Sequence, residues 1–213
     1  NSLEILKVVN VLKGEAKEEK LLEVVRALGG KILSSVGLVS NFEQGRHLIM
    51  KTLENGRAAE IFEKMVWSLG GAANFLSKVD SLLLKAPLVK DIYSFSEGYV
   101  NSIDSRSIGL GVLALGGGRK KSDDKIDYSV GFESLLGIND WVDSHIPLAR
   151  IHASDAKTLE LGKAIILDAY HIDQKKLGKI LKKADDITAM TLEEYKIYID
   201  DYTKKSKYLN INK

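Results

Sequence analysis

The pattern of apolar residues changes at Lys85-Ala86-Pro87, and no other feature of the sequence constrains the fold as strongly. Before this point apolar residues recur at helical spacing, as in LLEVVRAL at 21–28. After it come short segments rich in β-branched and aromatic residues, which are typical of strands: LVKDIYSF, GYVNSI, YSVGFESLL and IPLARIHA. Proline disfavours a helical conformation of the preceding residue, so we expect no helix to continue through Pro87. The sequence therefore predicts an α+β fold.

The same change divides the chain into three predicted parts. Residues 1–87 are expected to be helical. Residues 88–170 are expected to form a small module with a mixed β-sheet and two helices, at 105–115 and from a Ser154 cap onward. Residues 171–213 are charged and helical in tendency, so we expect a helical tail whose lysines form a solvated face.

Two short segments in the first part bear on where its helices begin and end. Gly29-Gly30 would normally end a helix, but an apolar pattern resumes directly after it, which leaves either two helices or one long helix. Ser40-Asn41-Phe42-Glu43 has the spacing of a capping box and predicts a helix start at this point.

Charge and composition exclude several classes of function. The 213 residues include 31 basic and 29 acidic ones, and the net charge of +2 provides no global field to attract nucleic acid or an anionic membrane. The absence of cysteine excludes a disulfide framework, a thiolate nucleophile and Cys-ligated zinc. No apolar run is long enough to span a bilayer. We therefore expect a cytoplasmic protein with no nucleic-acid and no membrane partner.

The segment LGGGRKKSDDKIDYSVGF at 115–132 is the strongest candidate for a functional loop. Consecutive glycines followed by cations are able to form a nest for a phosphate, but the spacing matches neither a P-loop nor a dinucleotide fingerprint. A mobile surface loop is the alternative that this pattern favours. The candidate residues are Gly116, Gly117, Gly118, Arg119 and Lys120, with Lys121 beside them.

The sequence contains no recognisable catalytic or metal-binding motif. The four histidines lack the His-Glu-x-x-His spacing of a zinc site, and we expect surface or packing roles for them: His47, His145, His152 and His171. No Gly-x-Ser-x-Gly elbow for a nucleophilic serine is present. We therefore assign no catalytic residue and no metal ligand.

Four separated blocks resemble the pyrimidine-nucleoside phosphorylase family. They are NSLEI at 1–5, LENGRAAEIFEKMV at 53–66, the segment 97–132 that includes the glycine-rich loop, and PLARIHASD at 147–155. The resemblance covers residues 1 to about 169 and implies the family's C-terminal α/β-hammerhead module. The ending YSVGF at 128–132 is more similar to the thymidine phosphorylase branch than to the broader pyrimidine enzymes.

The resemblance implies a pentosyltransferase of pyrimidine nucleoside salvage. Its reaction is the reversible phosphorolysis of thymidine or deoxyuridine to the base and 2-deoxyribose 1-phosphate, by a homodimer that uses phosphate as co-substrate and needs no cofactor. The chain opens inside a helical pattern without methionine, and we expect it to be the C-terminal half of a longer enzyme. The family's Lys-x-Ser-x-Gly-Gly-x-Gly-Asp phosphate loop does not occur in it, so we expect this chain alone to be inactive. The loop at 116–120 is then expected to act as a lid.

A non-catalytic interaction module of the barrel-sandwich type is the alternative. The strand pattern around GINDWVDSHIPLARIH is similar to the hairpins of biotinyl and lipoyl domains, whose turn presents a lysine for modification. Residues 137–147 contain no lysine, which disfavours a carrier function.

Overall fold

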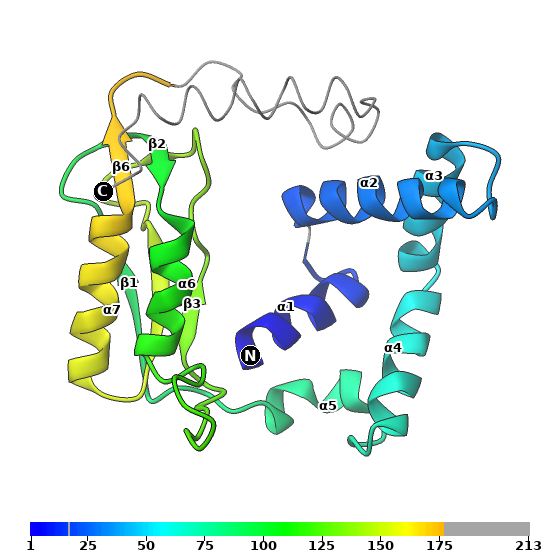
Figure 1. Ribbon diagram of the computed structural model, residues 1–213, viewed down its shortest axis with the longest axis horizontal. Coiled ribbons are helices and arrows are strands. Elements are labelled where there is room, and N and C mark those ends of the chain that lie inside the picture. Colours follow the sequence, from blue (N-terminus) through cyan, green and yellow to red (C-terminus); the bar gives the residue numbers. More distant parts are fainter. Residues whose placement is uncertain (17, 177–213) are drawn as a thin grey trace. The chain divides into compact units, whose positions relative to one another are not determined.

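The computed structural model describes residues 1–16 and 18–176 (Figure 1). The described residues fall into two compact units, one comprising 1–16 and 59–176 and the other 18–58. The predicted division at residue 87 stays a prediction, and most of the predicted helical tail lies outside the described residues. No helix within the described ranges is both long and apolar enough to cross a membrane.

The unit of residues 18–58 contains two helices that approach each other closely. They are α2 (Glu19–Ser35) and α3 (Phe42–Glu54). Gly29-Gly30 lies inside α2, which is one continuous helix. A Cβ atom on Gly30 would lie 2.8 Å from Cγ of Arg46, and one on Gly45 would lie 2.6 Å from the carbonyl oxygen of Gly30. The glycines are therefore needed for close helix contact, which outweighs their low helix propensity.

Three further helices precede the β-rich module: α1 (Ser2–Leu12), α4 (Arg57–Ser68) and α5 (Phe75–Leu82). Helix α1 contacts α5 and also the β-rich module. At the start of α1, the Ser2 amide donates to the carbonyl oxygen of Tyr128 at 3.0 Å. Helix α5 ends before Pro87, as the sequence predicts.

The β-rich module contains two three-stranded sheets and two helices. The first sheet has the order β1 (Leu88–Ile92), β5 (Ala149–Ala153), β3 (Gly131–Glu133). The second has the order β4 (Trp141–Val142), β2 (Gly98–Ile103), β6 (Tyr170–Asp173). The helices are α6 (Ser105–Ala114) and α7 (Ala156–Ala169), which pack against each other and run side by side in Figure 1.

The structure confirms the α+β fold class and corrects two details of the prediction. All strand pairs among the described residues are antiparallel, so two antiparallel sheets replace the single mixed sheet. The module also extends to residue 173, because β6 pairs with β2 and residues 171–173 are strand instead of helix. Helix α7 is capped by Asp155, whose side chain accepts from the amide of Thr158, and not by Ser154.

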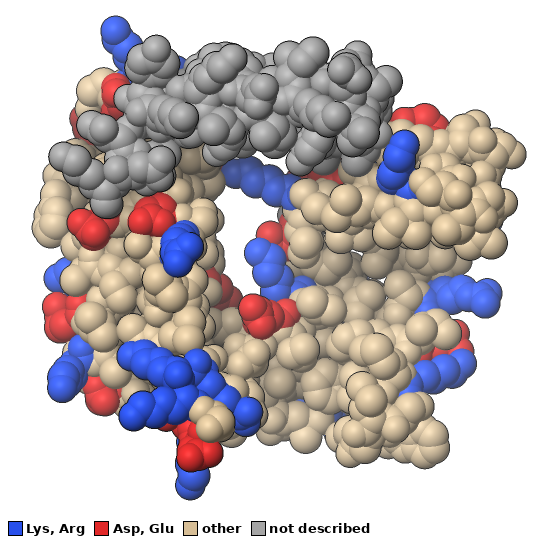
Figure 2. Space-filling model, in the orientation of Figure 1, with Lys and Arg blue, Asp and Glu red and all other residues tan. Residues whose placement is uncertain are grey.

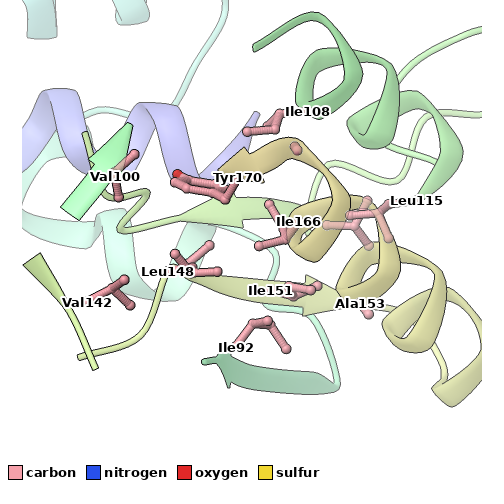
Figure 3. Packing of buried hydrophobic residues seen from close by; sticks show 13 residues of the cluster. Ile92, Val100, Ile108, Leu115, Val142, Leu148, Ile151, Ala153, Ile166 and Tyr170 are labelled. Atoms are coloured by element: carbon pink, nitrogen blue, oxygen red, sulfur yellow. The ribbon is translucent and has the colours of Figure 1, made fainter. Parts of the chain in front are cut away.

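The core of this module is built from alternate residues of the strands and one face of each helix (Figure 3). Its fully buried large side chains include Val100 of β2, Ile151 of β5 and Ile166 of α7. Tyr170 belongs to this core, and its hydroxyl donates to the carbonyl oxygen of Leu136 at 2.9 Å. Burial, with a smaller contribution from Asp140, raises the pKa of Tyr170 to about 12. The core thus fixes the sheets and helices from which the candidate loop projects.

Candidate functional site

The loop of residues 116–125, here called the glycine loop, begins at the end of α6. Gly116 has a φ of +95°, its amide donates to the carbonyl oxygen of Leu113 at 3.1 Å, and the Gly117 amide donates to that of Val112 at 2.9 Å. This pair of bonds is a Schellman motif, which satisfies the last carbonyl groups of a helix and favours glycine at positive φ. The Gly117 amide is therefore occupied by the helix cap and is not available to an anion.

Close packing adds a second reason for glycine at the start of the loop. A Cβ atom on Gly117 would lie 2.8 Å from Cγ1 of Val112, and one on Gly118 would lie 3.1 Å from Cγ of Leu113. The loop therefore folds back along the last turn of α6. A side chain on either glycine would crowd the last turn of α6.

The tip of the glycine loop is organised by a carboxylate of its own. The amides of Lys120 and Lys121 both donate to Oδ2 of Asp124 at 2.9 Å. These backbone hydrogen bonds, that from Lys121 first, hold the pKa of Asp124 below its ordinary value. A nest of backbone amides is thus present, as the glycine-rich spelling indicates, but it lies two to three residues after the glycines and Asp124 occupies it.

The two ends of the loop are fastened together. The amide of Asp127 donates to the carbonyl oxygen of Gly116 at 2.9 Å. The backbone amide and hydroxyl of Ser129 in turn donate to Oδ1 of Asp127, at 2.9 and 2.5 Å. A loop closed at its base in this way keeps its ends fixed, so that rearrangement is confined to residues between them.

The cations of the loop are directed to solvent. Arg119, Lys120, Lys121 and Lys125 are all exposed, and Figure 2 shows lysine and arginine side chains gathered over the loop after α6 with acidic side chains beside them. Among the described residues, no carboxylate forms an ion pair with Arg119. An anion approaching this loop would meet these side chains before it met a glycine amide.

A second set of charged groups lies on the sheet β1–β5–β3. Arg150 of β5 pairs with Asp91 of β1 through two hydrogen bonds, Nε to Oδ1 at 2.7 Å and Nη2 to Oδ2 at 3.1 Å. On the other side of β5, Nε2 of His152 lies 3.0 Å from Oε2 of Glu133 on β3. The hydrogen bond from Arg150 lowers the pKa of Asp91, and the Asp91 carboxylate raises that of Arg150. These four side chains form two cross-strand pairs on this sheet.

Most of the β-rich module resembles a known domain family in sequence. Residues 99–173 match the model of the pyrimidine nucleoside phosphorylase C-terminal domain. The match begins in β2 and ends with β6, and includes the glycine loop. It supports this domain type for the β-rich module, whereas the resemblance of residues 1–98 stays a prediction.

Within the matched residues 99–173, the predicted site residues separate into two groups. Gly116 and Gly117 end α6, while Arg119 and Lys120 lie at the exposed tip with the Lys120 amide bound to Asp124. The expected lid function of these residues stays a prediction. No group of three or more histidine, aspartate or glutamate side chains in the described part of the chain is arranged to hold a metal ion.

The two cross-strand pairs, Asp91 with Arg150 and Glu133 with His152, are not predicted from the sequence. His152 was interpreted as a surface or packing histidine, and its side chain is 14% exposed beside Glu133. The available signal was the alternation of polar and apolar residues in ARIHA at 149–153, which places Arg150 and His152 on one face of a strand. Nothing in that alternation identifies Asp91 or Glu133 as the partners.

A small open pocket lies in the unit of residues 1–16 and 59–176. It has a volume of about 260 Å³ and is lined by the start of α1, the end of α5 and Tyr128. Its lining is mainly apolar, with Ile5 and Leu82–Leu84 as the main contributors. No local sequence pattern indicates this pocket, because its walls come from three separate segments.

Proposed function

We propose that this chain is the C-terminal part of an enzyme that cleaves thymidine or deoxyuridine with phosphate, releasing the base and 2-deoxyribose 1-phosphate. The observation that carries the proposal is the match of residues 99–173 to the pyrimidine nucleoside phosphorylase C-terminal domain. The preference for thymidine over uridine rests on the block YSVGF at 128–132, which resembles the thymidine phosphorylase branch. The complete enzyme is proposed to be a cytoplasmic homodimer with no cofactor, in which phosphate is a co-substrate.

The proposed contribution of the glycine loop is to close over the substrates. Phosphorolysis joins an anionic nucleophile to a sugar carbon with oxocarbenium character, and it requires positioning, cationic stabilisation and exclusion of water. The loop is fixed at Gly116 and Asp127 and carries exposed cations between them. A segment with fixed ends and a solvated tip is able to change conformation without disturbing the core.

The direct test is a phosphorolysis assay of the natural full-length protein. Thymidine, deoxyuridine and uridine are each supplied with and without inorganic phosphate, and base and sugar phosphate are measured together. We expect phosphate-dependent release of thymine and uracil from the deoxynucleosides, at a higher kcat/KM than from uridine. Release of no base from any pyrimidine nucleoside would overturn the proposal, and equal use of uridine would remove its thymidine preference.

The 213-residue chain by itself is the matched control for this assay. Because its sequence contains no Lys-x-Ser-x-Gly-Gly-x-Gly-Asp phosphate loop, we expect it to release no thymine. Phosphate-dependent thymine release by this chain would show that the substrate contacts lie within residues 1–213.

A further inference from the structure

Ser122 lies at the exposed tip of the glycine loop, directly after three cations. Arg119 stands three residues before it, and Asp123 and Asp124 follow. Among the described residues, its hydroxyl contacts only Oδ1 of Asp123, at 3.3 Å. This distance is long for a hydrogen bond between two oxygens, so the hydroxyl is weakly held.

Two other described serines have a cation three residues before them, but their environments differ. Ser34 in α2 donates to the carbonyl oxygen of Lys31 at 3.0 Å, and Ser81 in α5 donates to that of Lys78 at 2.8 Å. An enzyme that modifies a serine must bind the surrounding chain in its own cleft, which a regular helix resists. Ser122 is the described serine that combines the preceding cation with a loop conformation and a weakly bonded hydroxyl.

The geometry points to Ser122 as a phosphoacceptor for an ATP-dependent protein kinase that selects basic residues before its target. In this step Oγ of Ser122 attacks the γ-phosphorus of ATP and forms a new O–P bond. The bond between the γ-phosphorus and the bridging oxygen breaks, ADP leaves, and the hydroxyl proton passes to the base of the kinase. Arg119 and the two lysines after it supply the positive charge by which such an enzyme recognises the loop.

The modification changes the charge balance of the tip. A phosphoserine carries a charge of about −1.5 to −2 at neutral pH and no longer donates a hydrogen bond to Asp123. The amides of Lys120 and Lys121 already bind Asp124. The phosphate is therefore expected to bind the guanidinium of Arg119, which forms no ion pair with any described carboxylate.

The first experiment incubates the 213-residue chain with ATP and a purified kinase that prefers arginine three residues before the acceptor. The site is mapped by mass spectrometry in wild type, S122A and R119Q, with S34A as the matched control. We expect one phosphoryl group on Ser122, none there in S122A, no change in S34A and phosphorylation about tenfold slower in R119Q, the factor for a contact worth about 1.4 kcal/mol. An unmodified Ser122, or an R119Q rate equal to wild type, would overturn the proposal.

A second measurement tests whether the phosphate binds the cations. The phosphoserine of the modified chain is titrated by ³¹P NMR, since its second pKa is near 6 in an isolated residue. Pairing with Arg119 favours the dianion and lowers the pKa of the phosphoserine below about 6. The phosphorylated R119K and R119Q variants lack the fork of guanidinium donors, so their pKa is expected to return toward about 6. A value at or above 6 in the wild type would show that Asp123 and Asp124 dominate, and would overturn the predicted pairing. This proposal does not depend on the nucleoside chemistry of the complete enzyme.

Discussion

The sheet β1–β5–β3 and the glycine loop hold their charged residues in opposite ways. In the sheet, Asp91 and Arg150 pair side chain to side chain across two strands that are 59 residues apart in sequence. In the loop, Asp124 binds backbone amides three and four residues away, and the neighbouring cations stay exposed. The sheet thus uses opposite charges to satisfy each other, while the loop uses its carboxylate to fix the backbone and leaves positive charge free for an outside partner.

The largest expected effect on stability comes from the core beneath the sheet β1–β5–β3. Ile151 lies between Arg150 and His152 on β5 and is fully buried. Ile151→Ala is expected to lower the free energy of unfolding by about 2–5 kcal/mol, because it leaves a cavity in the core. The measurement is urea denaturation followed by circular dichroism.

Val89→Ala is the matched control for that substitution. Val89 pairs in register with His152 and its side chain is 52% exposed. Its truncation is expected to change the free energy of unfolding by less than about 0.5 kcal/mol. Equal effects of the two substitutions would contradict the assignment of the buried face of β5.

The second prediction concerns the paired charges. A double-mutant cycle of Asp91→Ala and Arg150→Ala is expected to give a coupling free energy of about 0.5–1 kcal/mol, reduced by salt, because the pair is partly exposed but has two hydrogen bonds. The same cycle on Asp124 and Arg119 is expected to show no measurable coupling. A larger coupling in the loop than in the sheet would reverse the comparison.

The sequence predicted the elements of the module better than their partners. The change of pattern at Pro87 and the helix from Ser105 were both found, because each depends on local periodicity and on residues adjacent in the chain. The end of α6 at the glycines follows from the same local chemistry. Pairing of Asp91 with Arg150 depends on the register of two distant strands, which no local pattern specifies.

The errors at element ends have physical causes of the same kind. The cap of α3 is Asn41, one residue later than a box starting at Ser40 would place it, since its side chain accepts from the amide of Gln44. Residues 171–173 are predicted to belong to the tail, but they form a strand through the pairing of β6 with β2, which depends on a distant segment. In the loop, the glycine-rich spelling predicted an amide nest but not that Asp124 fills it.

The third prediction concerns the pH dependence of the stability that Asp91 provides by pairing with Arg150. Arg150 holds the pKa of Asp91 below its ordinary value of 3.8 in the folded state. The stabilisation is therefore present above the unfolded value and is lost as pH falls through the lower, folded value. As the pH is lowered from 5, the Tm of the wild type is expected to fall more steeply than that of Asp91→Asn. Parallel plots of Tm against pH for the two proteins would contradict this prediction.

The fourth prediction concerns local order in the loop instead of global stability. Asp124→Ala removes the acceptor for the amides of Lys120 and Lys121, so the tip is expected to open while the core is unchanged. Trypsin should cleave after residues 119–121 faster than in wild type, with the same Tm. Asp123→Ala is the control, because within residues 1–16 and 18–176 Asp123 accepts only from the Ser122 hydroxyl. Equal acceleration by both variants would contradict the role of Asp124.

The smallest expected effect on stability, and the sharpest test of the loop, comes from Arg119→Ala in the complete enzyme. Arg119 is exposed and forms no ion pair with any described carboxylate, so its removal should leave Tm unchanged. If the loop closes over the substrates, loss of this cation alters closure, and kcat and the apparent KM values for nucleoside and phosphate should change together. If Arg119 instead binds phosphate directly, the phosphate KM should rise while that for the nucleoside stays constant.

Lys125→Ala is the control, because it removes an exposed cation from the same loop beyond the Asp124 contact. It is expected to leave kcat and both KM values close to wild type. A fall in Tm with unchanged kinetics would mean that Arg119 serves only the folding of the loop, and would contradict its proposed function as part of a lid.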